Sequence, residues 1–419
     1  MNLEIILVRT VLVLTAALSV GISLWGGYYL LTGLMSWRRP MDYGRHPAGT
    51  RFAVLIAARN EELVIGPLIN SLLEQEYPAE LYDIYVIPNN CTDNTALAAR
   101  QFGAEVLECT VPVRSKGEVL RFAEEQLSGR HYDAFCVFDA DNVVDPGFLS
   151  AMNHAWCAGA RAAQGYRDSK NPHDTVISGN YSIYYWMVNR FYSHARNAVG
   201  LSAIVNGSGF MADLGLLREM GGWNTLTLTE DIEFTTKCIL RDVRVEWVPQ
   251  AVTYDEQPLT FAQSWRQRCR WSTGLYQCLS HYLSPLLRGL FTSGVHGFRA
   301  RLDQAVFLLA PIIQIFWLVS LIAGQAMRLL QVHYNLFPST PVFTSLFLSV
   351  LVSYAVSTAM AVAVTLLERK PVIPMLRGIL SYWVFLISWL PVNACCLVHR
   401  TTEWKSIAHT RSMGLSQIK

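Results

Sequence analysis

The chain has 419 residues, of which 52% are apolar and only 16% are charged, and its formal net charge is +2. Such a composition is too apolar for an ordinary soluble protein, and the small net charge without any basic run argues against nucleic acid as a partner. Nine cysteines show no metal-type C-x-x-C pairing, so we expect reduced thiols that pack mostly as small apolar side chains.

The first candidate element is an apolar run over residues 5–34, broken only by Arg9. A helix needs roughly 20 apolar residues to cross a bilayer, so this run is long enough to span one. It lacks a basic leading segment and a small-residue cleavage site, which favours a retained transmembrane helix, residues 1–36, over a signal peptide. Trp37, Arg38 and Arg39 follow it, and the positive-inside bias then predicts a multi-pass protein of the plasma membrane whose next domain is cytoplasmic.

Short apolar segments alternate with helical patterns between residues 50 and 258, which predicts an α/β domain with a mostly parallel sheet. Residues 52–56, 82–87 and 135–138 are predicted strands, and helices are expected over residues 62–74 and from Thr95 onward. A polar cluster follows each strand directly. Because ligands bind at the carboxyl ends of the strands in open α/β sheets, these clusters predict a binding edge.

Asp139 and Asp141 end the third of these strands. Two carboxylates one residue apart repel each other unless a cation lies near both, and their oxygens suit Mg²⁺ or Mn²⁺ bridging a diphosphate. An Asp-x-Asp-Asn segment is also an ordinary polar turn, so a metal site and a turn both remain open at this point.

Three further polar signals lie between the strands. Lys116 precedes a helix and suits either a phosphate contact or plain solvation. The glycines of Asn206-Gly207-Ser208-Gly209 would let a backbone approach a ligand closely, or would simply form a tight turn. In Thr229-Glu230-Asp231 the threonine could cap the helix that follows, and a carboxylate there could equally act as a general base on a sugar hydroxyl.

The segment Gln267-Arg268-Cys269-Arg270-Trp271 lies in an amphipathic region, residues 259–300, that we expect along the cytoplasmic membrane interface. Gln267, Arg270 and Trp271 would share one helix face, where arginine can bind phosphate and an indole can stack on a sugar ring. A basic residue beside a tryptophan is also typical of a membrane edge. The aromatic stretch from Tyr181 to Tyr192 could likewise line an acceptor groove or belong to the core.

The carboxyl-terminal part, residues 301–398, contains three apolar runs, at residues 304–330, 342–367 and 376–398. Pro391 interrupts the last run and the tail, residues 399–419, is basic, which favours a re-entrant or broken hairpin, or a miscounted span, and a cytoplasmic tail. Gln304, Gln314 and Gln325 in the second predicted span could face a polysaccharide path or could bond neighbouring helices together.

Six polar signals follow one another along the chain: Glu61, Asn90 with Asp93, Asp139-Ala140-Asp141, Asn206-Gly207-Ser208-Gly209 (the Asn206 loop), Thr229-Glu230-Asp231 and Gln267 to Trp271. Their order resembles that of the membrane-integrated family-2 glycosyltransferases, the relatives of cellulose, chitin and hyaluronan synthases. The resemblance covers residues 52–271 and the flanking apolar helices. It implies a Rossmann-like GT-A domain, cytoplasmic and inserted between transmembrane helices. It also implies a nucleotide-sugar donor, normally a uridine diphosphate (UDP) sugar, and Mg²⁺ or Mn²⁺ as cofactor.

The resemblance also implies a role for individual residues. Asp231 would be the base that activates the acceptor hydroxyl, with Glu230 beside it. Asp141 would bind the metal together with Asp139, and Trp271, Gly207 and Ser208 would contact the acceptor. The donor would be bound by Ala57, Glu61, Asn90, Asp93, Lys116, Asp139, Gln267, Arg268 and Arg270. One departure from the family pattern is Asn89-Asn90, which stands where many members have paired aspartates and leaves the identity of the donor open.

The function expected from these features is inverting transfer of a sugar from a UDP-sugar to the end of a growing β-linked polysaccharide or oligosaccharide, with export as a further option. A single addition to a lipid-linked acceptor is the alternative. A non-catalytic membrane scaffold is a third class, disfavoured by Asp141, Asp231 and Arg270. Because a base must be ionised, we expect the pKa of Asp231, near a helix start, to be ordinary or low.

Overall fold

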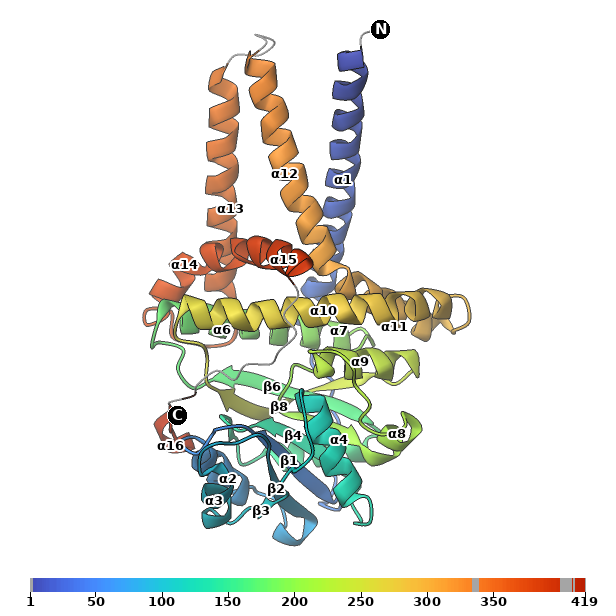
Figure 1. Ribbon diagram of the computed structural model, residues 1–419, viewed down its shortest axis with the longest axis vertical. Helices are drawn as coiled ribbons and strands as arrows, with labels where there is room; N and C mark the ends of the chain where they lie inside the picture. The colour runs from blue at the N-terminus through green and yellow to red at the C-terminus, as the bar shows by residue number, and fades with distance from the viewer. Residues whose placement is uncertain (1–2, 334–338, 400–408, 410, 419) are drawn as a thin grey trace.

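The computed structural model describes residues 3–333, 339–399, 409 and 411–418. It has three levels, seen from top to bottom in Figure 1. Three long helices stand upright: α1 (Leu3–Gly33), α12 (Ala310–His333) and α13 (Ser339–Leu367). Helices that lie across their lower ends form the middle level, and an α/β domain forms the lowest level.

The α/β domain is built on an eight-stranded sheet with the order β3-β2-β1-β4-β7-β6-β8-β5. The strands β1 to β4 pair in parallel, β7 runs antiparallel between β4 and β6, and β6 pairs in parallel with β8. The predicted parallel sheet is therefore confirmed for its first half. The strands are β1 (Phe52–Ala58), β2 (Tyr82–Pro88), β3 (Glu105–Val106), β4 (Ala134–Asp139), β5 (Val143–Val144), β6 (Ala162–Ser169), β7 (Phe210–Asp213) and β8 (Val245–Asp255).

Both faces of the sheet are covered by helices, which explains why β1 is an uninterrupted apolar run. Alternate residues of β1 pack against α2 (Ile65–Leu73), α3 (Thr95–Gln101) and α5 (Phe148–Cys157) on one face. The others pack against α4 (Lys116–Leu127), α8 (Leu214–Glu219) and α9 (Glu230–Leu240) on the opposite face. The described residues also form five short helical segments: η1 (Leu34–Trp37), η2 (Ala79–Leu81), η3 (Val188–His194), α7 (Ala195–Asn197) and α16 (Leu415–Ile418).

The helix predicted over residues 62–74 begins later, at Ile65. Asn60 has a positive φ of 59°, and the next two backbone N–H groups donate to the loop after β2 rather than to a helix. Glu61 N donates to Thr95 Oγ1 and Glu62 N donates to an Asp93 carboxylate oxygen. The polar residues before α2 therefore tie two neighbouring strand ends together.

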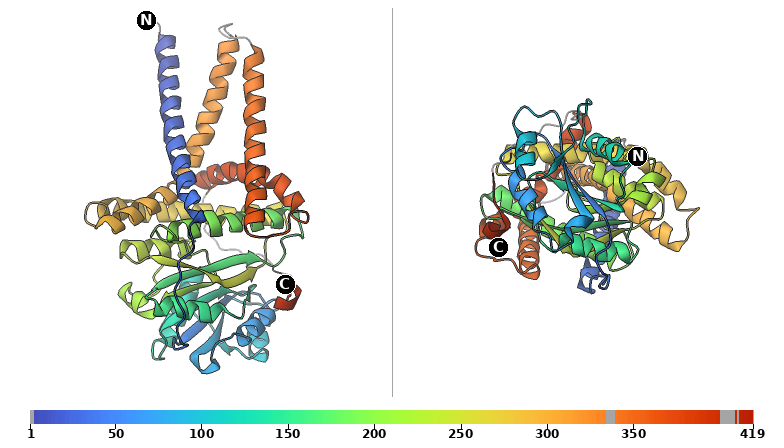
Figure 2. Two further views of the ribbon diagram at one scale, coloured as in Figure 1. Left: turned by 180° about the vertical axis from the view of Figure 1, so that it is seen from behind. Right: turned by 90° about the horizontal axis from the view of Figure 1, so that it is seen from below.

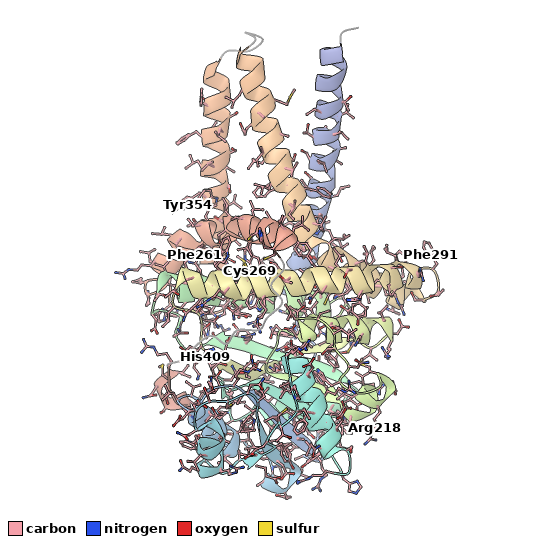
Figure 3. All side chains as sticks on the ribbon, in the orientation of Figure 1. Arg218, Phe261, Cys269, Phe291, Tyr354 and His409 are labelled. Atoms are coloured by element: carbon pink, nitrogen blue, oxygen red, sulfur yellow. The ribbon has the colours of Figure 1, made fainter. Side chains whose placement is uncertain are left out.

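The middle level consists of α6 (Val176–Met187), α10 (Phe261–Gly289), α11 (Val295–Leu308), α14 (Leu376–Ile387) and α15 (Trp389–Val398). A capping box of Thr260 and Gln263 starts α10, the long helix that carries the Gln267 to Trp271 segment. It packs against α15 above and α9 below. In Figure 3, Phe291 is labelled at the outer end of the pair formed by α10 and α11, and Cys269 is labelled on the half of α10 that is nearer Phe261.

Four segments are long and apolar enough to cross a membrane: Val13–Trp37, Ala310–Met327, Phe343–Leu367 and Leu376–Val398. The last one is broken at Ser388 into α14 and α15, which run across the foot of the upright helices when seen from in front and from behind (Figures 1 and 2). The broken segment was predicted, and Pro391 accounts for it. A continuous helix would need an N–H at residue 391 to bond to the carbonyl oxygen of Ile387, the last residue of α14, and proline has none. Pro391 instead lies in the first turn of α15, where no helical hydrogen bond needs its missing N–H.

The second span starts later than residue 304, which corrects the sequence-based boundary. Gln304 lies in α11, buried, and its Nε2 donates to Thr236 Oγ1 of α9 at 2.8 Å. Gln314, in α12, accepts a hydrogen bond of 2.6 Å from Asn393 of α15. These two glutamines therefore connect helices. The described tail residues lie beside the α/β domain, on the side away from the free ends of the upright helices (Figure 1).

Candidate functional site

A cavity of about 420 Å³ lies between the carboxyl edge of the sheet and the middle level of helices. Its lower end is polar and its upper end reaches α1 and α12. Among the residues predicted from the sequence, the cavity brings together Lys116, Asp139, Gly207, Glu230, Asp231, Gln267, Arg270 and Trp271. Of the three strand-end clusters predicted from the sequence, the one at Asp139 therefore reaches the cavity, and the other two lie outside its lining.

Asp139 ends β4 and is paired with Lys116, the first residue of α4. Lys116 Nζ lies 2.5 Å from Asp139 Oδ1 and 2.7 Å from the carbonyl oxygen of Gly207. Burial would raise the pKa of Asp139, but attraction to Lys116 and Arg167 outweighs it and holds this pKa below its usual range. Lys116 is thus a partly buried charge partner of Asp139, with 13% of its side chain exposed, and the simple solvation considered from the sequence is wrong.

Gly207 separates the two carboxylates that face the cavity. Its φ of +91° is in the left-handed region, and a Cβ at this position would lie 3.4 Å from Asp231 Oδ2 and 4.0 Å from Asp139 Oδ2. Glycine therefore keeps open the space that both carboxylates share. Its neighbour Ser208 does not reach the cavity. Ser208 is buried, its Oγ accepts from Asp139 N at 3.0 Å and donates to Asn142, so its assignment as an acceptor contact is corrected to a structural role at the end of β4.

Glu230 and Asp231 begin α9, but Thr229 does not cap the helix with its side chain. Asp231 Oδ1 accepts from Ile232 N at 2.8 Å, which leaves Oδ2 on the side of Gly207. Burial raises the pKa of Asp231, and burial together with Asp231 raises the pKa of Glu230 to about 7. The expected ordinary or low pKa of Asp231 is therefore wrong, because burial outweighs the helix start and the nearby cations.

Gln267, Arg270 and Trp271 face the cavity from α10, as their helical spacing predicted. Within the part of the chain that the structure describes, the Arg270 guanidinium makes no hydrogen bond, and its charge lowers the pKa of Asp139, Glu230 and Asp231. Gln267 Oε1 is also buried without a partner there. Trp271 is stacked with Tyr184 and Trp389, with ring centroids 6.4 and 6.3 Å apart and planes inclined by 23° and 18°.

Arg268 points away from this cavity. It is fully buried and donates to Ser388 Oγ at 2.6 Å and to the carbonyl oxygen of Phe385 at 3.3 Å, at the break between α14 and α15. Its guanidinium also lies 4.9 Å from the centre of the Phe385 ring. Its assignment as a donor-binding residue is therefore corrected: Arg268 holds the broken helix pair onto α10.

Arg167 in β6 is a cavity residue that the sequence analysis missed. It is paired with Asp255 of β8 at 2.5 Å and lies over the ring of Tyr185 at 4.3 Å. Its charge contributes to the low pKa of Asp139. A lone arginine inside a strand carries no signal of this role in the sequence. Of the aromatic stretch, Tyr184, Tyr185 and Tyr192 line the cavity, whereas Tyr181 and Trp186 pack in the core against α14. The core interpretation is therefore confirmed for part of the stretch, and an acceptor contact by the cavity residues stays a prediction.

A second polar group lies near the strand ends and consists of Glu61, Asp141 and His409. His409 Nδ1 lies 3.0 Å from Glu61 Oε2, and its Nε2 lies 3.8 Å from Asp141 Oδ2. Burial lowers the pKa of His409, but Asp141 and Glu61 outweigh it and raise this pKa to about 10. Burial raises the pKa of Glu61. Figure 3 labels His409 below α10, at the level of the sheet.

The tail residue His409 was not identified from the sequence, because nothing in a basic tail predicts a contact with Asp141 or with Glu61, which lies 348 positions earlier. Asp141 is buried, and its Oδ2 accepts from Glu256 N at 3.1 Å. The tail is held there by Arg411, whose backbone N–H donates to Glu256 Oε2 at 3.0 Å and whose side chain pairs with Asp174 at 2.7 Å. The carboxyl-terminal tail thus reaches the edge of the candidate donor site.

The remaining predicted donor residues lie at the ends of β1 and β2, outside the cavity lining. Ala57 pairs with Asp139 across β1 and β4. Asn90 has a φ of 48° and donates to the carbonyl oxygen of Val113 at 3.0 Å, and Asp93 accepts from Thr95 N and Glu62 N. At Asn89, where many family members have an aspartate, the side-chain amide donates to the carbonyl oxygen of Ala58 at 2.9 Å and so ties β2 to β1.

An α/β sheet covered on both faces, with carboxylates and cations gathered at its strand ends below apolar helices, is the arrangement of a membrane-associated GT-A sugar transferase. A family model described as "Glycosyltransferase like family 2" matches residues 47–274, more than half of the chain. The protein therefore belongs to family 2 of the glycosyltransferases, as the order of its motifs predicted.

Two curated relatives illustrate the similarity. The beta-monoglucosyldiacylglycerol synthase of Synechocystis sp. is 25% identical over 267 residues, which are 61% of this chain and 53% of the relative. The poly-beta-1,6-N-acetyl-D-glucosamine synthase of Staphylococcus epidermidis is 24% identical over 251 residues, 56% of this chain and 57% of the relative. The chain thus spans a little over half of the length of these relatives.

Among solved structures, the mannosyltransferase PcManGT from Pyrobaculum calidifontis, in complex with GDP-Man and Mn²⁺, superposes with a TM-score of 0.60. The match covers 93% of this chain and 98% of that one at 19% identity. At this identity the likeness shows a shared fold, and it extends over the apolar helices as well as the GT-A domain.

Proposed function

We propose that this protein is an inverting, metal-dependent membrane glycosyltransferase that moves a sugar from a nucleoside diphosphate sugar, in the first instance a UDP-sugar, to a hydroxyl group of a saccharide or lipid acceptor. The observation that carries this proposal is the pair of carboxylates, Asp139 and Asp231, that face one space across Gly207, with Lys116 and Arg270 beside them. We place the α/β domain in the cytoplasm, where nucleotide sugars are available.

Asp231 would act as the general base. In a single displacement, the acceptor hydroxyl transfers its proton to Asp231 Oδ2 and its oxygen forms a bond to the anomeric carbon. The bond between that carbon and the diphosphate oxygen breaks, and the diphosphate leaves with the electron pair. One displacement from the opposite face inverts the anomeric configuration. A raised pKa makes the ionised Asp231 a stronger base, which supports this role.

Arg270 and Lys116 would stabilise the charge that develops on the leaving diphosphate. Both carry positive charge at the polar end of the cavity, and the guanidinium of Arg270 has donors to spare in the described part of the chain. Fixed cations in a partly buried site stabilise such charge more than water does. Gln267, with its unpartnered buried oxygen, lies on the same face of α10 and would bind a hydroxyl of the donor.

The family fold implies a divalent metal, and the residues near Asp141 fit one. Asp141 offers a carboxylate, which suits both Mg²⁺ and Mn²⁺. His409 would offer an imidazole once the metal has displaced the proton that its raised pKa retains, and an imidazole suits Mn²⁺ better than Mg²⁺. Among the described residues, no three His, Cys, Asp or Glu side chains are placed to hold a metal by themselves. We therefore expect the oxygens of the donor diphosphate to complete the site. When bound, the metal would neutralise part of the diphosphate charge.

The proposal is tested with the full chain in lipid nanodiscs. A panel of UDP-sugars and guanosine diphosphate (GDP) mannose is offered with Mn²⁺ or Mg²⁺, together with saccharide and lipid acceptors, and the release of nucleoside diphosphate and the glycosylated product are measured. We expect one donor to be used, and a β-linked product from an α-linked donor by NMR. Retention of the donor configuration would contradict the single displacement, and failure to bind any nucleotide would contradict the proposed function as a whole.

A further inference from the structure

The cavity has a second end that the catalytic residues do not use. Its polar end contains Asp139, Asp231 and Arg270, and its other end lies among the helices of the upper and middle levels. The side chains at this membrane end are aromatic or aliphatic and come from α1, the junction of α11 and α12, and the last turn of α14: Trp25, Tyr29, Phe307, Ala310, Pro311 and Leu386. The cavity therefore changes from charged to apolar along its length.

Aromatic rings lie where the cavity lining changes from charged to apolar. Trp271, Tyr184 and Trp389 are stacked between the two ends, directly beyond the face of α10 that carries Arg270. Rings of this kind accommodate both a sugar or polar headgroup and an apolar chain. They form the boundary at which an amphipathic molecule would change from headgroup to tail.

The polar side chains at the membrane end bond to one another. Asn393 donates to Gln314 Oε1 at 2.6 Å and accepts from Ser272 Oγ at 2.6 Å. These hydrogen bonds join α10, α12 and α15. Because Gln314 Oε1 and both polar atoms of the Asn393 side chain are already paired, this network offers few hydrogen bonds to a polar occupant. An occupant of this end is surrounded mainly by apolar surface.

Helix α1 forms one wall of this end of the cavity, and several polar contacts hold it to the rest of the protein. Arg196 and Asp303 form a buried ion pair at 2.9 Å below it, and Tyr28 of α1 donates to the same Asp303 carboxylate at 2.5 Å. Trp25 Nε1 donates to the carbonyl oxygen of Val306, and the Arg196 guanidinium lies 5.1 Å from the centre of the Tyr29 ring. These contacts place the two cavity residues of α1 against α11.

A polysaccharide acceptor and a lipid acceptor would differ in the free energy of entering this apolar end of the cavity. Each hydroxyl of a polysaccharide would lose hydrogen bonds with water against apolar walls, which costs free energy for every unpaired group. The chain of a lipid that enters from the bilayer would exchange one apolar environment for another and would lose no hydrogen bond. Exposed apolar side chains of α1 and α12, such as Leu24 and Phe316, continue from this end to the surface that faces the bilayer.

We infer that the acceptor is a membrane lipid with a free hydroxyl on its headgroup, which enters from the bilayer with its apolar chain along α1, α12 and α15 and its hydroxyl at Asp231. This inference rests on the proposed function and names its acceptor class. It favours single addition to a lipid over extension of an exported polysaccharide.

The test fills the membrane end and leaves the donor site untouched. Ala310→Trp places an indole in the apolar end of the cavity, and Val319→Trp places the same side chain on α12 where Val319 is 50% exposed and outside the cavity. Full-length proteins are reconstituted in phosphatidylcholine nanodiscs containing dioleoylglycerol or ceramide as the hydroxyl-bearing lipid. Labelled donor in the organic phase is measured, together with nucleotide affinity.

We expect the wild type to form a labelled lipid, Ala310→Trp to lose at least about 10-fold of this transfer, and Val319→Trp to stay within about 2-fold of wild type. Nucleotide affinity should be the same in all three proteins, which also shows that each is folded. Leu386→Trp fills the same end from α14 and is used if Ala310→Trp fails to bind nucleotide.

Two results would overturn the lipid acceptor while leaving the proposed function intact. One is nucleotide-dependent transfer by the wild type to soluble saccharides and to none of the lipids. The other is labelled lipid formed equally by the wild type and by both cavity-filling variants. If the wild type binds no nucleotide, the proposed function and the lipid acceptor both fail.

Discussion

Arg268 and Arg270 lie two positions apart on α10 and face opposite sides of it. Arg268 is buried against Phe385 and Ser388 at the break between α14 and α15, whereas Arg270 lines the cavity near Asp139 and Asp231. A helix turns by about 100° per residue, so neighbours at this spacing point about 200° apart. Two identical side chains in one short motif therefore have different roles, and each arginine has its own prediction.

Arg270→Ala should weaken nucleotide sugar binding at least about 10-fold, since a charge-assisted hydrogen bond contributes roughly 1.5–3 kcal/mol. Its thermal unfolding should stay close to that of the wild type, because the guanidinium lines an open cavity. Arg268→Ala should instead lower the unfolding temperature, since it leaves Ser388 Oγ and the Phe385 carbonyl oxygen buried with one partner fewer.

Both variants are measured by nucleotide calorimetry and by thermal unfolding in the same nanodiscs. Arg288→Ala, in the last turn of α10, serves as the matched control. An Arg268→Ala protein that unfolds like the wild type but binds donor poorly would show that the donor-binding role assigned from the sequence was right.

Asp231→Asn should reduce the turnover number by about 10²- to 10⁴-fold, the usual contribution of a general base. Donor affinity should change little, because the amide keeps the shape of the side chain and the hydrogen bond from Ile232 N. Steady-state rates and nucleotide titrations measure the two effects separately. Asp42→Asn, on the exposed segment after η1, is the control for the substitution itself. Turnover by Asp231→Asn at the wild-type rate would exclude Asp231 as the base.

Glu230→Gln should move the acidic limb of the pH profile of kcat/KM to lower pH. Both carboxyl pKa values are raised by burial, and that of Glu230, about 7, is raised further by Asp231. The two groups titrate as a pair, so a neutral residue at position 230 removes a repulsion and lets Asp231 ionise at a lower pH. Activity is lost as pH falls, because the base becomes protonated.

The profile is measured between about pH 4.5 and 8.5 for the wild type, for Glu230→Gln and for Glu125→Gln, an exposed surface control. We expect the control to follow the wild type. If Glu230→Gln follows it as well, the acidic limb belongs to a group other than this pair.

His409→Ala should weaken Mn²⁺ binding in the presence of a nucleoside diphosphate by about 10-fold or more, because it removes the imidazole beside Asp141. Binding is followed by the loss of the electron paramagnetic resonance signal of free Mn²⁺, which is independent of turnover. His281→Ala, an exposed position on α10, is the control. Equal Mn²⁺ affinity in the two variants would place the metal away from the tail.

Much of the GT-A domain followed from the sequence. The strands β1, β2 and β4 are buried on both faces, so most of their residues had to be apolar. The polar residues after them had to lie at one edge because the strands are parallel. The shared face of Gln267, Arg270 and Trp271 followed from the helical repeat alone. The break of the last apolar segment was also predicted from Pro391, and it lies at Ser388, within one turn of that proline.

Other features depended on contacts between distant segments. Ser208 was assigned to the acceptor because its glycine-rich loop suggested close approach, yet its hydroxyl supports Asp139 and Asn142. Gln304 was placed in a span, yet it is bonded to Thr236 of α9. The pKa of Asp231 was expected to follow its helix position, yet burial among α9, α10 and the Asn206 loop dominates it.

The sequence by itself determined the family, the order of the strands that end in polar residues, and the face of α10 that meets the cavity, because local periodicity and chain direction control these features. Only the tertiary structure decided that Arg268 and Ser208 are structural, that His409 reaches Asp141, and that long apolar helices complete the cavity above Asp231. Burial and pairing depend on which distant residues meet, and that information is spread over the whole chain.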